Sequence, residues 1–112
     1  MKSQYRGVSW CPTTKTWKVQ LKLGGTVRII YRAVDEEACA WVADFCRYLV
    51  YGFDFRQWHH KSQKPNHAPH VSDKVSRAEI VATLLRLGIA EPDGLPPFLA
   101  EYDRLAGLLR PV

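Results

Sequence analysis

The sequence lacks a long apolar run, a rich set of cysteines and, over its first third, any acidic residue. No apolar stretch approaches the roughly 18 residues that a transmembrane helix needs, so no membrane span is predicted. The opening Met-Lys-Ser-Gln-Tyr has no apolar core, so no secretory signal is predicted. The three cysteines are an odd and sparse set, which favours free thiols in a reducing compartment over a disulfide framework.

Length and composition narrow the class of protein further. At 112 residues the chain has room for one domain, or for one small domain with an appendage, and a multi-domain enzyme is excluded. Hydrophobic residues make up 46% and charged residues 24%, which are ordinary values for a globular chain and exclude wholesale disorder.

The missing acids make the first third of the chain strongly basic. Residues 1–34 hold seven basic side chains and no carboxylate, whereas the whole chain has a net charge of +5. The seven are Lys2, Arg6, Lys15, Lys18, Lys22, Arg28 and Arg32. Such a segment attracts polyanions, nucleic acid before anionic membrane, and the alternative is a solvated basic face with no partner.

Three strands are predicted in this basic segment. Residues 5–10 form a short strand that Cys11-Pro12-Thr13-Thr14 ends, and residues 17–23 alternate between polar and apolar side chains. Gly24-Gly25 is a two-residue hairpin signal, and residues 27–31 resume a β-branched pattern. The pattern predicts an antiparallel meander.

Strict alternation assigns each strand residue to a face. It predicts one apolar face with Val19, Leu21, Leu23, Ile29 and Tyr31, and an opposite, basic face with Lys18, Gln20, Lys22, Arg28, Ile30 and Arg32. Three strands alone are only marginally stable, so a helix must cover the apolar face and leave the basic face outward.

That helix is predicted over residues 35–52. Asp35 is a suitable N-cap, acids follow in the first turn, and Gly52 is a suitable stop. A broad apolar stripe recurs at helical spacing at Ala38, Trp41, Val42, Phe45, Tyr48 and Leu49.

The rest of the chain predicts a linker and a helical extension. Residues 53–75 lose periodicity and read as a linker or irregular arm, which holds His59, His60, His67 and His70. No Cys-x-x-Cys pair accompanies these histidines, so no metal site is predicted. Over residues 76–110 a helical hairpin is expected, with a capping box at Ser76, a stop at Gly88, a turn over 92–97 and a second helix from Phe98 to near Pro111. The fold class is therefore α+β, a three-stranded antiparallel sheet packed on one helix and followed by a C-terminal helical extension.

The first half of the chain resembles a known DNA-binding family. Tyr5-Arg6-Gly7-Val8, a Trp twelve residues after that Tyr, the basic alternating strand, Gly24-Gly25 and Glu36-Glu37-Ala38 are similar to the Apetala-two/ethylene-response-factor domain over residues 3–52. The resemblance implies a sheet that lies in the major groove of duplex DNA, a role in transcription and a nuclear location. Departures in the helix and in the contact positions are closer in style to the apicomplexan branch.

The resemblance also implies a set of DNA-binding residues. These are Arg6, Gly7, Ser9, Cys11, Lys15, Lys18, Gln20, Lys22, Arg28, Ile30 and Arg32. Ser9, Cys11 and Ile30 stand where plant members have two arginines and a tryptophan. Arg6 and Arg28 suit bidentate pairing with guanine and Gln20 suits adenine, whereas lysines suit phosphates.

The sequence thus predicts a sequence-specific duplex-DNA-binding module of transcription-factor type. It is not expected to be an enzyme or to use a cofactor, a metal or a small-molecule substrate. The alternative is a protein-interaction module on the same fold that has lost base readout. The extension over 76–110 either enlarges the core or forms a homodimer or protein-partner interface.

Overall fold

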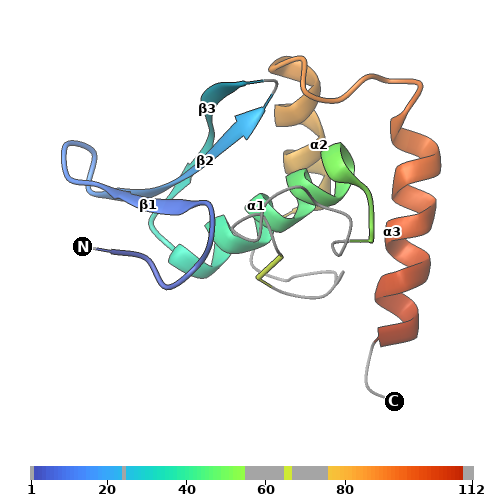
Figure 1. Ribbon diagram of the computed structural model, residues 1–112, viewed down its shortest axis with the longest axis horizontal. Helices are drawn as coiled ribbons and strands as arrows, with labels where there is room; N and C mark the ends of the chain where they lie inside the picture. Colours follow the sequence, from blue (N-terminus) through green and yellow to red (C-terminus); the bar gives the residue numbers. More distant parts are fainter. Residues whose placement is uncertain (1, 24, 55–64, 67–75, 110–112) are drawn as a thin grey trace.

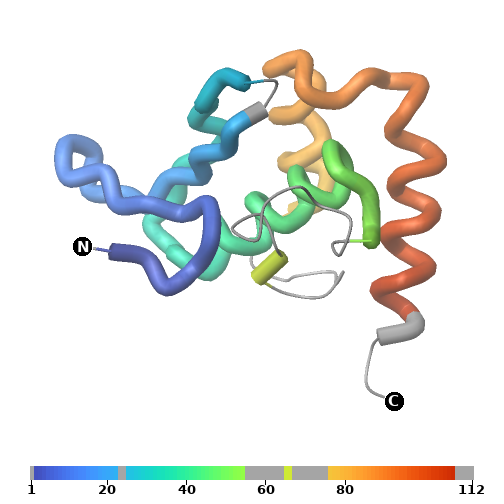
Figure 2. The backbone as a smooth tube through the Cα atoms, viewed as in Figure 1, coloured from blue at the N-terminus to red at the C-terminus, as the bar shows by residue number. Residues whose placement is uncertain are grey.

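The computed structural model describes residues 2–23, 25–54, 65–66 and 76–109 (Figure 2). In chain order its elements are β1 (Val8–Cys11), β2 (Thr16–Leu23), β3 (Thr26–Ala33), α1 (Glu36–Tyr51), α2 (Arg77–Arg86) and α3 (Leu95–Leu109). In Figure 1 the sheet lies at one end of the view and α3 at the other, with α1 between them. The predicted α+β class, with a three-stranded antiparallel sheet and a helical C-terminal extension, is confirmed.

The sheet has the strand order β1-β2-β3, and both pairs are antiparallel. The first strand begins at Val8 rather than at residue 5, because Gly7 has a φ of 81° and interrupts the extended chain. Two residues join β2 to β3; Gly25 has a φ of 83°, as a tight hairpin requires, and Gly24 lies outside the described residues.

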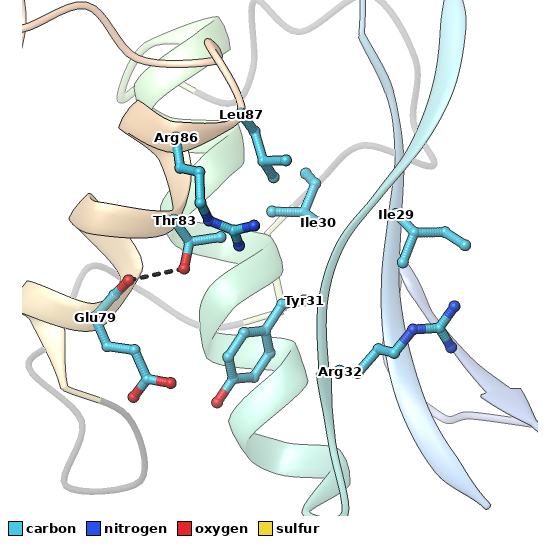
Figure 3. A pocket seen from close by; sticks show the side chains of 8 residues that line it. All are labelled: Ile29, Ile30, Tyr31, Arg32, Glu79, Thr83, Arg86 and Leu87. Carbon is cyan, nitrogen blue, oxygen red and sulfur yellow. Dashed lines mark hydrogen bonds between the residues drawn. The ribbon is translucent and has the colours of Figure 1, made fainter. Parts of the chain in front are cut away.

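A β-bulge in β3 changes which residues face α1. Val19 lies opposite Tyr31, but the next residue of β2, Gln20, lies opposite Ile29, so Ile30 is the extra residue. Ile30 is 5% exposed and Ile29 is 43% exposed. Figure 3 shows Ile30 and Tyr31 on the side of β3 that faces α2, with Ile29 and Arg32 on the other side. The prediction that placed Ile29 on the covered face and Ile30 on the basic face is wrong, because it assumed unbroken alternation.

Helix α1 covers the apolar side of the sheet with the predicted ends. Asp35 is the N-cap, and its carboxylate accepts hydrogen bonds from the backbone N–H groups of Glu37 at 2.9 Å and Ala38 at 3.3 Å. Gly52 is the C-cap. Ten residues of α1 are buried, because the extension covers the side that the sheet leaves open; of the predicted stripe, Trp41 and Leu49 are only partly buried.

The C-terminal extension differs from prediction at its helix starts. Ser76 is the N-cap of α2, but its side chain makes no capping hydrogen bond. Gly88 follows the helix with a φ of 73°, as expected of a stop. Helix α3 starts at Leu95 and takes Pro96 and Pro97 into its first turn, where a missing N–H removes no helical hydrogen bond. The predicted turn over 92–97 is therefore too long.

The extension packs against α1 and shares its core. Leu84, Leu95 and Tyr102 are at most 5% exposed and belong to the same buried cluster as Phe45. The Phe45 ring lies 5.0 Å from that of Tyr102 and 5.2 Å from that of Phe98. The expectation that the extension enlarges a small core is confirmed.

Candidate nucleic-acid interface

The side of the sheet away from α1 is a polar and basic surface, called the open face below. The cross-strand pairs Ser9–Lys18, Cys11–Thr16, Lys18–Arg32, Gln20–Ile29 and Lys22–Val27 place its side chains. None of these nine residues is buried, and none is acidic. Three of them carry a positive charge.

The covered face of the same strands is apolar. Val8, Trp17, Val19, Leu21 and Ile30 are at most 9% exposed and pack in the core with α1. Trp10 lies opposite Trp17 in the register, with its ring 5.1 Å away in an edge arrangement. Both tryptophans therefore belong to the core side, which leaves polar groups to dominate the open face.

The central strand gives the open face its main pattern. Lys18, Gln20 and Lys22 alternate along β2 on this face, so an amide stands between two ammonium groups. Neighbouring side chains on one face of a strand lie about 7 Å apart. Arg32 on β3 lies opposite Lys18 and is exposed.

Two further predicted contact residues flank the open face. Lys15 is exposed in the turn between β1 and β2 and has a φ of 54°. Arg6 is exposed in the turn before β1, where its backbone N–H donates to Asn66 Oδ1 at 2.7 Å. Both cations are therefore exposed next to the ends of β1, and the Arg6 backbone is held from the side of α1 by Asn66 and Arg47.

Two predicted contact residues are not on the open face. Arg28 lies opposite the buried Leu21, and its Nη2 donates to the Leu87 carbonyl in the extension at 2.8 Å. Ile30 is buried as the bulge residue. The prediction that these two side chains lie on the basic face is wrong, because the bulge reverses the phase of β3 at this point.

Gly7 has a packing role. A Cβ on Gly7 would lie 2.7 Å from Arg47 Nη2 and 3.0 Å from Leu21 Cδ2, so a side chain there would have to displace the buried Arg47 guanidinium. Its carbonyl accepts from the Gln20 N–H at 2.9 Å, which extends the β1–β2 pairing by one residue. Gly7 therefore positions the start of β1 beside the open face.

Ser9 and Cys11 lie on the open face as predicted, and they differ chemically. The Ser9 hydroxyl oxygen is inaccessible to solvent and has no hydrogen-bond partner within the described residues. Hydrogen bonds to Cys11, first from the Thr14 side chain, then from the Thr14 backbone and from Arg32, lower the pKa of its thiol to about 6. These hydrogen bonds favour the thiolate form of Cys11 beside the Arg32 guanidinium.

The other two cysteines are chemically opposite to Cys11. All three are free, but Cys39 and Cys46 are buried in α1. Burial raises the pKa of Cys39 to about 11 and that of Cys46 to about 12. Burial therefore favours the neutral thiol form of both side chains in the core.

A buried polar cluster beneath the open face was missed by sequence reasoning. Asp44 Oδ1 accepts from the Asn66 backbone N–H at 2.7 Å and from its Nδ2 at 3.2 Å, and Arg47 Nη1 lies 3.8 Å away. Arg47 Nη1 and Asn66 Nδ2 both donate to the Arg6 carbonyl. Burial lowers the pKa of Arg47, and the Asp44 carboxylate opposes that shift. The available signal was a pair of charges at i and i+3 inside an apolar helix.

A groove of about 380 Å³ separates β3 from α2 (Figure 3). Its lining consists of Ile29, Ile30, Tyr31, Arg32, Glu79, Thr83, Arg86 and Leu87. Burial, and then the charge of Glu79, raises the pKa of Tyr31. The sequence does not predict this groove, because it forms where a distant helix meets the edge strand of the sheet.

His59, His60, His67 and His70, with most of the predicted linker over 53–75, lie outside the described residues. Among the residues that the structure describes, no group of His, Cys, Asp or Glu side chains could hold a metal ion. None of the helices described is both long enough and apolar enough to cross a membrane.

No protein-family model matches the chain, and no curated protein matches it. The resemblance of residues 3–52 to the Apetala-two/ethylene-response-factor domain therefore stays a prediction. The candidate site is defined by its own geometry, as the basic, carboxylate-free face of a sheet that is anchored on its other side.

Proposed function

We propose that this chain binds double-stranded DNA in a sequence-specific way through the open face of its sheet. The observation that carries the proposal is the charge on that face: Lys18, Lys22 and Arg32 project from it, Lys15 lies beside it, and it holds no Asp or Glu, the Cys11 thiol being its acidic group. A carboxylate-free basic surface attracts the phosphate backbone, and the apolar reverse side fixes which surface is presented.

The dimensions of the sheet suit the major groove. An antiparallel ribbon of two strands fits a groove of about 12 Å width, and β2 and β3 form such a ribbon. The two lysines of β2 then reach phosphates, while Gln20 between them points at base edges, where an amide pairs with adenine. Arg6, exposed just before β1, is the remaining candidate for a guanine contact.

The proposed role is that of a transcription factor in the nucleus, as the family resemblance implies. The proposal involves no catalysis, cofactor or small-molecule substrate.

A second function, protein interaction on the same fold, is favoured by one observation. The bulge removes Arg28 and Ile30 from the open face, so two of the expected base contacts are not available there. The groove between β3 and α2 is a surface that a protein segment could use instead.

The experiment that separates the two functions is a selection from a randomised duplex DNA pool at physiological salt. Sequence-specific binding yields an enriched motif, and the symmetry of that motif reports whether one copy or two bind. An unenriched pool with no binding overturns the proposal and supports the protein-interaction function. Binding without enrichment refutes base readout and leaves only backbone attraction.

Matched charge variants locate the interface. The double variant K18A/K22A removes two charges from the open face, and the control R77A/R104A removes two from α2 and α3, where Arg77 pairs with Asp103 and Arg104 with Glu101. With five phosphate contacts, log K falls with log salt at a slope of about −4 to −5. We expect K18A/K22A to reduce that slope by about 2 and the control to leave it unchanged.

A further inference from the structure

The open face carries two exposed apolar side chains among its charges. Ile29 is 43% exposed and Val27 is 53% exposed, and both project from β3 on this side. Ile29 lies directly opposite Gln20 on the central strand. In Figure 3 its side chain points away from α2, and it does not join the core.

The bulge is what exposes Ile29. Without the extra residue, alternation would place Ile29 opposite Leu21 on the covered face and turn Ile30 outward; with it, Ile30 fills the core and Ile29 is presented on the basic surface. An apolar, β-branched side chain thus stands beside a bidentate amide, at the centre of a charged surface.

Building on the proposed DNA binding, we propose that Ile29 contacts the 5-methyl group of a thymine and that Gln20 reads the adjoining adenine. In the major groove, thymine presents its methyl group as an apolar contact, while the edges of guanine and cytosine present hydrogen-bonding groups. Phosphates offer no partner for an isoleucine. The pair Gln20–Ile29 therefore makes the centre of the open face selective for A·T pairs in DNA.

The same chemistry distinguishes DNA from RNA. Uracil lacks the 5-methyl group, and the deep, narrow major groove of an RNA duplex does not admit the sheet. A side chain that recognises the thymine methyl therefore adds affinity only for DNA.

The test uses the full chain and three 16-base-pair probes: an A·T-rich duplex, the same duplex with every thymine replaced by deoxyuridine, and a G·C duplex. Burial of one methyl group predicts that deoxyuridine weakens wild-type binding about three- to tenfold. Ile29→Ala loses about the same factor on the thymine duplex and no longer distinguishes thymine from uracil. Val50→Ala is the matched control, because Val50 has a similar exposure, 41%, and lies on α1.

The outcomes separate the two proposals. If the wild type binds every probe with equal affinity, the thymine contact is wrong while DNA binding stands. If it binds none of them, the proposed function fails. If Ile29→Ala instead dissolves a dimer seen by sedimentation, the apolar patch joins two copies of the chain and the thymine contact is overturned. Far-ultraviolet circular dichroism verifies that each variant is folded.

Discussion

On the covered face of the sheet, Val19 and Ile30 are at most 5% exposed, and the neighbouring buried Arg47 donates to the Arg6 carbonyl and pairs with Asp44. On the open face, the side chains of Gln20, Lys22 and Ile29 are exposed, although Ile29 also lines the groove toward α2 and the Lys22 carbonyl accepts a hydrogen bond from the Tyr51 hydroxyl of α1. The two faces share one backbone, and the bulge at Ile30 decides which side chains belong to each. The difference teaches that the covered face determines stability, whereas the open face is free to vary for recognition.

The largest expected effect comes from breaking the buried pair below the sheet. Asp44→Ala leaves Arg47 buried without its carboxylate partner, and we expect the free energy of unfolding to fall by about 3–5 kcal/mol in urea titrations. The exposed pair Glu101–Arg104 is the control, and Glu101→Ala should cost less than about 1 kcal/mol. Equal losses for the two variants would contradict a structural role for the buried pair.

Adjacent isoleucines test the bulge itself. Ile30→Ala creates a cavity in the core and should cost about 2–5 kcal/mol. Ile29→Ala removes an exposed side chain and should change stability by about 0.5 kcal/mol or less. Thermal or urea unfolding measures the stability of both variants. A larger loss for Ile29→Ala than for Ile30→Ala would mean that Ile29 is the buried residue and that β3 has no bulge.

A substitution at Gly7 tests how tightly the start of β1 packs against Arg47 and Leu21. Gly7→Ala places a Cβ against Arg47 and Leu21 at a φ of 81°, and should cost about 1–3 kcal/mol. Gly107 in α3 has open space around it, so Gly107→Ala should leave stability unchanged or raise it by up to about 1 kcal/mol. A tolerated alanine at Gly7 would mean that the N-terminal turn is not held by Arg47.

The last test leaves the fold intact and compares the reactivity of the partly exposed Cys11 with that of the two buried cysteines. Hydrogen bonds from Thr14 and Arg32 stabilise the Cys11 thiolate, so iodoacetamide labelling of Cys11 should rise with pH through a midpoint near 6. Cys39 and Cys46 should stay unlabelled in the folded chain, since burial raises their pKa values to about 11 and 12. Peptide mass spectrometry measures labelling at all three sites. A labelling midpoint above about pH 8 would mean that Cys11 has an ordinary thiol pKa and that the hydrogen bonds do not stabilise its thiolate.

Local signals predicted much of the fold. The alternation over residues 17–23 located β2, and the Asp35 cap and Gly52 stop located α1. The bulge could not be predicted, because Ile29 and Ile30 are the same residue type and either one could fill the core. The hydrogen bond between Asn66 and Asp44 could not be predicted from sequence either, because Asn66 lies 22 residues beyond Asp44.

The candidate site was predicted in part for the same reason. The β2 residues Lys18, Gln20 and Lys22 lie on the face that alternation assigned to them, because the extra residue of the bulge belongs to β3 and leaves the alternation of β2 unbroken. Arg28 was assigned to the wrong face, because the bulge at Ile30 reverses the alternation of β3, and its side chain instead donates to the Leu87 carbonyl just after α2. Whether any of these residues contacts DNA stays a prediction.

Hydrogen bonds join residues 3–52 to the rest of the chain, and they affect whether this segment could be used as a separate fragment or fused to another protein. Arg28 donates to the Leu87 carbonyl, and Asn66 bridges Asp44 to the Arg6 carbonyl. A fragment cut at Gly52 would keep its strands and α1 but would lose both of these partners and the aromatic packing from α3. The half of the chain that resembles a transplantable module therefore relies on the C-terminal helices for part of its packing, and we expect a fusion or truncation to need them.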